Sequence, residues 1–187
     1  MINDKVSDYI FHTTFDSSIT DITDQIFGED INWQDHTWTD NYGKSVGSSS
    51  PTKVTYQHKL GIGDELYQAL TNYIKEYFNY IDNDYFKVEA LTALSEIRFN
   101  KYNSGSLMES HIDHIRSLFD GEQKGIPILS IVGLLNDDFI GGEFILCGNE
   151  MKLKKNSLLI WPSNFMYPHR VAEIKEGTRY SFVAWLW

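Results

Sequence analysis

The sequence predicts a mainly β fold of the α+β class: a double-stranded β-helix, or jelly roll, with supporting helices on one outer face. Three observations predict it. One segment near the middle of the chain has helical spacing, and the second half consists of short apolar segments with a period of two. Turn-forming residues separate these segments, and the β-α-β alternation of a parallel sheet is absent.

The helical segment runs from Asp64 to Ile81, where apolar residues recur at three- and four-residue spacing. This spacing predicts an amphipathic helix that packs on a sheet and begins at Gly63 or Asp64. The apolar positions are Leu66, Leu70, Tyr73, Ile74, Tyr77, Phe78 and Ile81.

Five later segments alternate in hydrophobicity as half-buried strands do. Gly, Asn, Asp or Pro residues lie between them, which indicates tight turns and an antiparallel sandwich or barrel. The predicted strand segments are 91–102, 128–136, 143–147, 157–161 and 179–187.

The length of 187 residues is suited to one domain with a substantial core. We expect a single domain over 1–187, in which residues 1–90 form a helical or irregular support region and 91–187 form the jelly-roll core. Residues 1–63 are the least informative, and the segment GKSVGSSSP at 43–51 is typical of a flexible loop.

Composition excludes several classes of protein. The net charge is −10, and residues 1–40 carry nine acidic residues against Lys5 alone, so the chain should repel phosphate backbones and not bind nucleic acid. A single cysteine, Cys147, cannot form an internal disulfide, and neither a secretory leader nor a membrane-spanning run is visible. We therefore expect a cytoplasmic protein without membrane contact, and the sequence indicates no oligomeric state.

The segment MESHIDH carries the first candidate site residues. His111 and Asp113 lie two positions apart, which on a strand places both side chains on one face, about 6–7 Å apart. Iron(II) in oxygenases is typically held by two imidazoles and one carboxylate. His169, after the strand at 157–161, is the candidate second histidine. Arg179 lies ten residues further, as a hairpin of two adjacent strands would allow, and could bind a carboxylate through two parallel hydrogen bonds.

Five motifs in this order carry a resemblance to a known family: HID (111–113), LLND (134–137), GGEF (141–144), LLIWPSNFMYPHRV (158–171) and GTRYSFVAWLW (177–187). Together they resemble the prolyl 4-hydroxylase-like 2-oxoglutarate/iron(II)-dependent dioxygenases over roughly residues 95–187. The resemblance implies that His111, Asp113 and His169 bind iron and that Arg179 binds the distal carboxylate of 2-oxoglutarate. It also implies co-substrate contacts for the side chains of Tyr102, Ser181 and Trp185. For Tyr102 and Trp185, a role in the apolar core would produce the same sequence pattern.

The implied reaction is hydroxylation of an unactivated C–H bond, with Fe(II) as cofactor and with 2-oxoglutarate and O2 as co-substrates. Succinate and CO2 are the co-products, and ascorbate is a candidate reductant. The implied substrate is a prolyl residue of a protein or peptide, bound by loops such as 103–109, 114–127 and 35–58. An alternative function is a non-catalytic jelly-roll module that binds a ligand or sugar. The second arginine pattern of nucleic-acid-dealkylating relatives is absent after His169.

Other polar residues are expected to have ordinary roles. Gly141 and Gly142 fit a tight turn into a strand. We expect His114 to point away from Asp113, and Cys147 has no neighbouring base that would activate it. The remaining histidines, His12, His36 and His58, are interpreted as ordinary polar residues.

Overall fold

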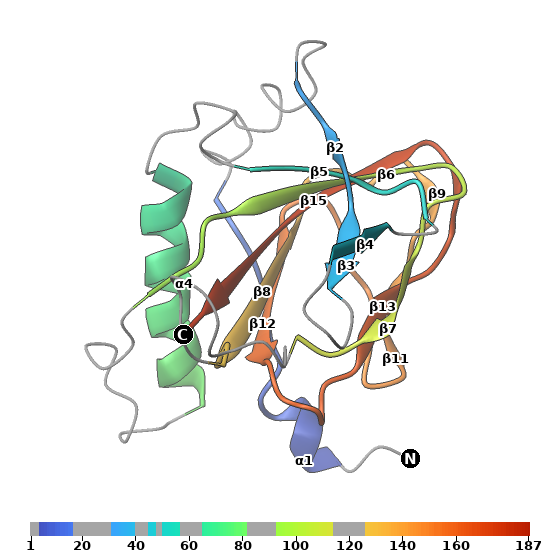
Figure 1. The fold of residues 1–187 in the computed structure, drawn as a ribbon. Coiled ribbons are helices and arrows are strands. Elements are labelled where there is room, and N and C mark those ends of the chain that lie inside the picture. Colours follow the sequence, from blue (N-terminus) through green and yellow to red (C-terminus); the bar gives the residue numbers. More distant parts are fainter. Residues whose placement is uncertain are drawn as a thin grey trace.

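The computed structural model describes residues 4–16, 31–39, 45–47, 50–56, 65–81, 93–113 and 126–187. Every strand pair in these ranges is antiparallel, as the alternation of the sequence predicted. A seven-stranded sheet and a four-stranded sheet form the body of the fold (Figure 1). The main sheet has the order Phe11–Thr14 (β1), Ser157–Pro162 (β12), Leu129–Leu134 (β8), Thr178–Leu186 (β15), Arg98–Asn103 (β6), Lys53–Tyr56 (β5) and Gln34–Asp35 (β2).

The smaller sheet packs against the main sheet and completes the sandwich. Its order is Asn149–Met151 (β11), Phe144–Leu146 (β10), His169–Val171 (β13) and Met108–His111 (β7). Two further strand pairs are Ile174–Glu176 (β14) with Ile140–Gly141 (β9), and Thr37–Thr39 (β3) with Ser45–Gly47 (β4). Side chains of both sheets meet in one buried cluster that includes Tyr102, Val132, Leu159, Trp161, Phe144, Leu146 and Val171. This two-sheet core confirms the predicted mainly β jelly roll.

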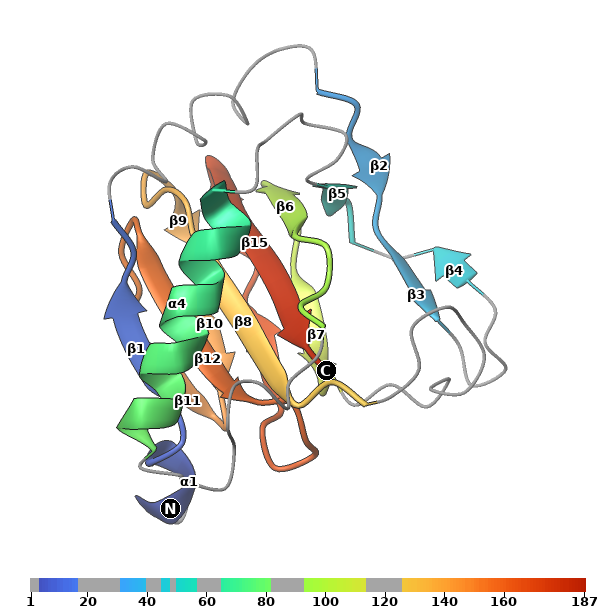
Figure 2. The same ribbon diagram turned by 90° about the vertical axis from the view of Figure 1, so that its left-hand side faces the viewer.

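Helix α4, Glu65–Tyr80, covers the outer face of the main sheet (Figure 2). Leu66, Leu70 and Ile74 are almost fully buried and join Phe99 and Phe182 of the sheet in a second apolar cluster. The helical spacing therefore predicted both the helix and its buried face. Gly63 and Asp64, predicted as its start, lie outside the described residues.

The N-terminal part contributes strands that the sequence pattern did not predict. β1 extends one side of the main sheet by pairing with β12, and β5 extends the other side by pairing with β6. The flexible-loop interpretation of 43–51 is wrong for Ser45–Gly47, which form β4, a strand paired with β3.

The five predicted strand segments all contain strands, namely β6, β8, β10, β12 and β15. The first is shorter than expected, because residues 93–97 form only an isolated bridge between Leu94 and Leu186 before β6 begins at Arg98. Among the described helices, none has the length and apolar character needed to span a bilayer.

Candidate active site

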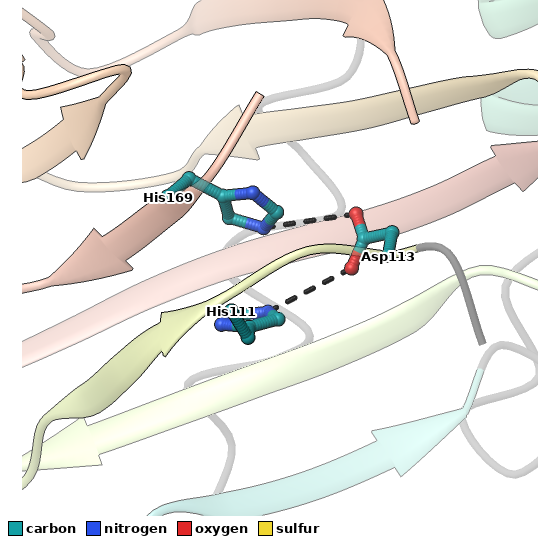
Figure 3. Close-up of side chains that lie close together, drawn as sticks. All are labelled: His111, Asp113 and His169. Carbon is teal, nitrogen blue, oxygen red and sulfur yellow. Dashed lines mark ion pairs between the residues drawn. The ribbon is translucent and has the colours of Figure 1, made fainter. Parts of the chain in front are cut away.

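Three predicted ligands converge at the edge of the smaller sheet (Figure 3). His111 ends β7 and His169 begins β13, and the two residues lie opposite each other in the pairing of these strands. Nε2 of His111 is 3.7 Å from Oδ1 of Asp113, and Nε2 of His169 is 3.6 Å from Oδ2 of the same carboxylate. One candidate ligand atom from each residue lies within 4.8 Å of the others, which is close enough for a single ion to contact all three.

Two details differ from the sequence-based geometry. Strand β7 ends at His111, and Asp113 lies in the bend that follows, so the pair does not occupy two positions of one strand. The bend lets the carboxylate lie nearer the imidazole than strand spacing would. The predicted hairpin between His169 and Arg179 is also wrong, because β13 belongs to the smaller sheet and β15 to the main sheet. His114 lies outside the described residues.

Backbone carbonyls orient both imidazoles. Nδ1 of His111 is 2.8 Å from the carbonyl oxygen of Glu109, and Nδ1 of His169 is 3.2 Å from that of Tyr167. A ring that donates its Nδ1–H to a carbonyl keeps the Nε2 lone pair available, as metal-binding histidines commonly do. Both available nitrogens then face the carboxylate of Asp113.

The carboxylate of Asp113 is held by two hydrogen-bond donors. The hydroxyl of Ser130 donates to Oδ2 at 2.6 Å and lies 2.7 Å from the Ser163 hydroxyl, while the side chain of Trp185 also donates to Asp113. Burial alone would raise the pKa of Asp113, but His169, His111 and these donors together lower it. The hydrogen bonds favour the ionised form whatever the charge of the rings.

Burial is the largest influence on His111. It lowers the pKa of this imidazole, and nearby His169 acts in the same direction, although Asp113 opposes it. A neutral imidazole and an ionised carboxylate are the protonation states that metal binding requires.

The three side chains line a pocket of about 440 Å³, which includes space open to solvent. Its floor is formed by neighbouring strands β6 and β15, where Arg179 pairs with Tyr102 and Val183 pairs with Arg98. Apolar side chains from both sheets form the walls, including Met108, Ile131, Val132, Phe144 and Val171. The pocket therefore lies between the sheets and has charged groups among its lining side chains.

Arg179 is 1% exposed and lies in this pocket. Its Nη1 donates to the Ser181 hydroxyl at 2.9 Å, and its guanidinium carbon lies 5.3 Å from the centre of the Tyr102 ring. Nε and Nη2 are buried without a hydrogen-bond partner. The Nε–H group and the Nη2 amino group are thus available for an anion at a buried position, where a carboxylate is a suitable partner.

The glycine pair occupies the turn that the sequence predicted. Gly141 and Gly142 both have positive φ, at 81° and 66°. A side chain at Gly142 would collide with Ile174 and approach Cδ of Arg179 to 3.2 Å. The glycine therefore leaves room for the arginine as well as permitting the turn.

The remaining predicted site residues fall into two groups. Ser181 and Tyr102 contact Arg179, whereas Trp185 lies at the other end of the pocket beside Asp113. The sequence did not predict the places of two further residues. Arg98 lines the pocket, with its guanidinium carbon 5.0 Å from the centre of the Trp185 ring. His36, which the sequence indicated to be an ordinary polar residue, is buried outside the pocket lining, and burial, Arg98 and His111 lower its pKa to about 4.

The residues present fit both groups that the sequence implied. Two imidazoles and one carboxylate are the donor set of non-haem iron(II) oxygenases. A buried arginine with two unpaired N–H groups in the same pocket suits the free carboxylate of a dicarboxylic co-substrate. Fold and donor set together define the class of non-haem iron oxygenases.

Comparison with known proteins agrees with this class. The family model of the 2OG-Fe(II) oxygenase superfamily matches residues 97–187. PKHD-type hydroxylases from two strains of Prochlorococcus marinus, NATL1A and NATL2A, are each 26% identical over 187 residues, covering 96% of this chain and 77% of each relative.

Solved structures share the fold. A prolyl hydroxylase from Trichoplax adhaerens, in complex with a hypoxia inducible factor oxygen degradation domain peptide fragment, has a TM-score of 0.69 at 16% identity, covering 97% of this chain and 84% of that one. An oxidoreductase of the 2OG-Fe(II) oxygenase family from Burkholderia pseudomallei has a TM-score of 0.66 at 16% identity, covering 97% and 90%.

The family-model match over residues 97–187, the PKHD-type hydroxylase relatives and the shared fold together support a prolyl 4-hydroxylase-like 2OG oxygenase, as the sequence motifs indicated. The same findings support an oxygenase enzyme. Its family implies Fe(II), 2-oxoglutarate and O2 as cofactor and co-substrates.

Proposed function

We propose that this enzyme hydroxylates a prolyl residue of a protein or peptide, with Fe(II) held by His111, Asp113 and His169. The observation that carries the proposal is that this triad and Arg179, whose buried Nε and Nη2 have no hydrogen-bond partner, line one pocket. The Trichoplax prolyl hydroxylase has the same fold and is in complex with a peptide fragment, which supports a peptide substrate for this enzyme.

At the metal end, the chain provides three ligands and the groups that orient them. The carbonyls of Glu109 and Tyr167 fix the imidazole rings, while Ser130 and Trp185 fix the carboxylate of Asp113. A triad leaves further coordination positions free for co-substrate and dioxygen. When bound, Fe(II) with 2-oxoglutarate and O2 supplies the oxidation that hydroxylates a C–H bond and yields succinate and CO2.

At the other end, Arg179 binds the distal carboxylate of 2-oxoglutarate through its two unpaired N–H groups. Ser181 holds Nη1, and the Tyr102 ring packs against the guanidinium, so that the fork is oriented before the co-substrate enters. The apolar walls exclude water from the space between the two ends. Ascorbate is the proposed reductant that keeps the iron in its divalent state.

We assign the whole chain, 1–187, to one domain with residues 91–187 as catalytic core and 1–90 as support. The pairing of β1 with β12 and of β5 with β6 supports this assignment, since both N-terminal strands extend the sheet that carries Arg179.

Turnover of a proline-containing peptide library tests the proposed substrate. Fe(II)-loaded protein with 2-oxoglutarate, O2 and ascorbate should form succinate, and some library members should gain one oxygen atom on proline by tandem mass spectrometry. Asp113→Ala is the control and should do neither. Succinate formation with oxygen found only on residues other than proline would contradict the prolyl assignment and leave the oxygenase activity intact.

A further inference from the structure

Arg98 places a second guanidinium in the active-site pocket. It lies on β6, two residues before Asn100 and four residues before Tyr102. These two residues share its face of the strand and also line the pocket. The residue is partly buried, and its Nε is fully buried without a hydrogen-bond partner. Within the described part of the chain, no hydrogen bond or ion pair holds this guanidinium. Its ring contact with Trp185 is what orients it.

The two arginines lie at different places in the pocket. The guanidinium of Arg179 packs on Tyr102, while that of Arg98 packs on Trp185, whose side chain donates a hydrogen bond to Asp113. Arg98 is also close enough to Asp113 for their charges to interact. Arg98 therefore lies between the two ends of the pocket, close enough to interact with Asp113 at the metal end and with Tyr102 at the co-substrate end.

The charges of the loaded pocket do not balance without a further anion. A divalent metal and the guanidinium groups of Arg98, Arg170 and Arg179, which all line the pocket, bring five positive charges, because arginine stays protonated even when buried. Asp113 and the two carboxylates of 2-oxoglutarate bring three negative charges. His36 adds none near neutral pH, since its pKa is lowered to about 4. Two positive charges remain among the described residues. Arg170 is exposed, so Arg98 is the partly buried group without an assigned partner.

We infer that Arg98 binds a carboxylate of the prime substrate and so positions the reacting carbon next to the metal. The inference rests on the proposed function, because it assigns 2-oxoglutarate to Arg179. A planar guanidinium that packs beside an indole ring, as Arg98 does with its guanidinium carbon 5.0 Å from the centre of the Trp185 ring, keeps N–H groups that suit bidentate binding of a carboxylate. That carboxylate comes either from an amino acid's own α-carboxyl group or from an acidic side chain next to a reacting residue in a peptide.

Binding measurements separate the two sources and do not depend on turnover. Isothermal titration calorimetry on the Mn(II)- and 2-oxoglutarate-loaded protein would use two matched pairs of probes. One pair is L-proline and L-prolinamide, and the other is a hexapeptide with glutamate after proline and its glutamine counterpart. A carboxylate preference of roughly 10- to 100-fold is expected in at least one pair, as for a hydrogen-bonded charged group. Preference in the first pair indicates a free amino acid, and preference in the second indicates an acidic peptide.

Variants assign that preference to the residue. Arg98→Met keeps an apolar stem against Trp185 and should abolish the preference, while Arg98→Lys should retain part of it. Lys175→Met, which removes one exposed charge on β14, is the matched control and should retain all of it. Near-UV circular dichroism and the melting temperature check that each variant is folded.

Three results would overturn the inference. These are equal affinity within both probe pairs, a carboxylate preference that survives in Arg98→Met, and a loss of 2-oxoglutarate affinity above tenfold in Arg98→Met without any probe. The last result would make Arg98 a second co-substrate clamp. If the parent protein bound neither Mn(II) nor 2-oxoglutarate, the proposed function would fall first and the inference with it.

Discussion

Replacing Arg179 with Met removes the proposed co-substrate clamp and leaves the metal ligands in place. The side chain is 1% exposed, and its Nε and Nη2 groups have no partner within the protein, so both are available to one carboxylate. Loss of such a bidentate, charge-assisted contact from a buried site costs about 2–5 kcal/mol. This raises the dissociation constant for 2-oxoglutarate by roughly thirty-fold to several thousand-fold.

Thermal unfolding of the Mn(II)-loaded protein measures this loss. At a 2-oxoglutarate concentration 100 times its dissociation constant, binding stabilises the parent by about 2.7 kcal/mol. For a chain of this size that corresponds to a rise in melting temperature of about 5–11 °C. At the same 2-oxoglutarate concentration, binding should raise the variant's free energy of unfolding by less than about 1 kcal/mol and its melting temperature by no more than about 3 °C.

Controls separate the clamp from the fold. Arg179→Met without ligand should keep the parent's melting temperature, because Met fills a similar volume and the lost Ser181 hydrogen bond is offset by removal of buried unpaired N–H groups. Its affinity for Mn(II) should be unchanged, and Arg179→Lys should fall between Met and the parent for 2-oxoglutarate. A full ligand-induced shift in Arg179→Met would refute the clamp and place the co-substrate carboxylate elsewhere.

Three further predictions follow from the same pocket. Asp113→Ala should abolish both Mn(II) binding and succinate formation, which calorimetry and a succinate assay check; retained metal affinity would exclude this carboxylate as a ligand. Folding lowers the pKa of His36 to about 4, from about 6.5 in the unfolded chain. Its contribution to the free energy of unfolding is therefore fully present above pH 6.5 and is lost as the pH falls towards 4. Urea unfolding between pH 4.5 and 7 should therefore show that the free energy of unfolding falls on acidification, and that this fall is about 1–3 kcal/mol smaller in His36→Gln than in the parent. Equal dependence of the free energy of unfolding on pH in the two proteins would contradict the effect of burial. Gly142→Ala should cost about 1–3 kcal/mol of unfolding free energy and weaken 2-oxoglutarate binding, because the added methyl collides with Ile174 and crowds Arg179; unchanged affinity would show that the clamp tolerates the shift.

The fold could be predicted where hydrophobic periodicity was strong. Helix α4 buries one face, β15 largely alternates, and β8 and β12 are apolar strands buried at nearly every position, so local pattern and tertiary packing agree. Strands β1 and β5 are four residues long with mixed polarity, and their pairing partners lie far along the chain. Their strand state depends on tertiary contacts that a local pattern does not contain.

The site could be predicted as a set of residues but not as an arrangement. His111, Asp113 and His169 do converge, yet Asp113 does so from a bend after β7, and the strands of His169 and Arg179 belong to different sheets. Sequence spacing gives no information about which sheet a strand joins. Arg98 was missed although the sequence contained a signal for it. Tyr102 was predicted to face the co-substrate, and side chains on a strand return to the same face every two residues. That rule places residue 98 in the same pocket.

A structure of the protein with Mn(II) and a 2-oxoglutarate analogue tests the central claim most directly. The account predicts one metal ion per chain, with Nε2 of His111, Nε2 of His169 and one carboxylate oxygen of Asp113 at distances near the ~2.0–2.2 Å of other first-row metal sites. It also predicts the far carboxylate of the analogue on the guanidinium of Arg179. A metal bound elsewhere, or these three side chains more than about 5 Å apart with the metal present, would contradict the account.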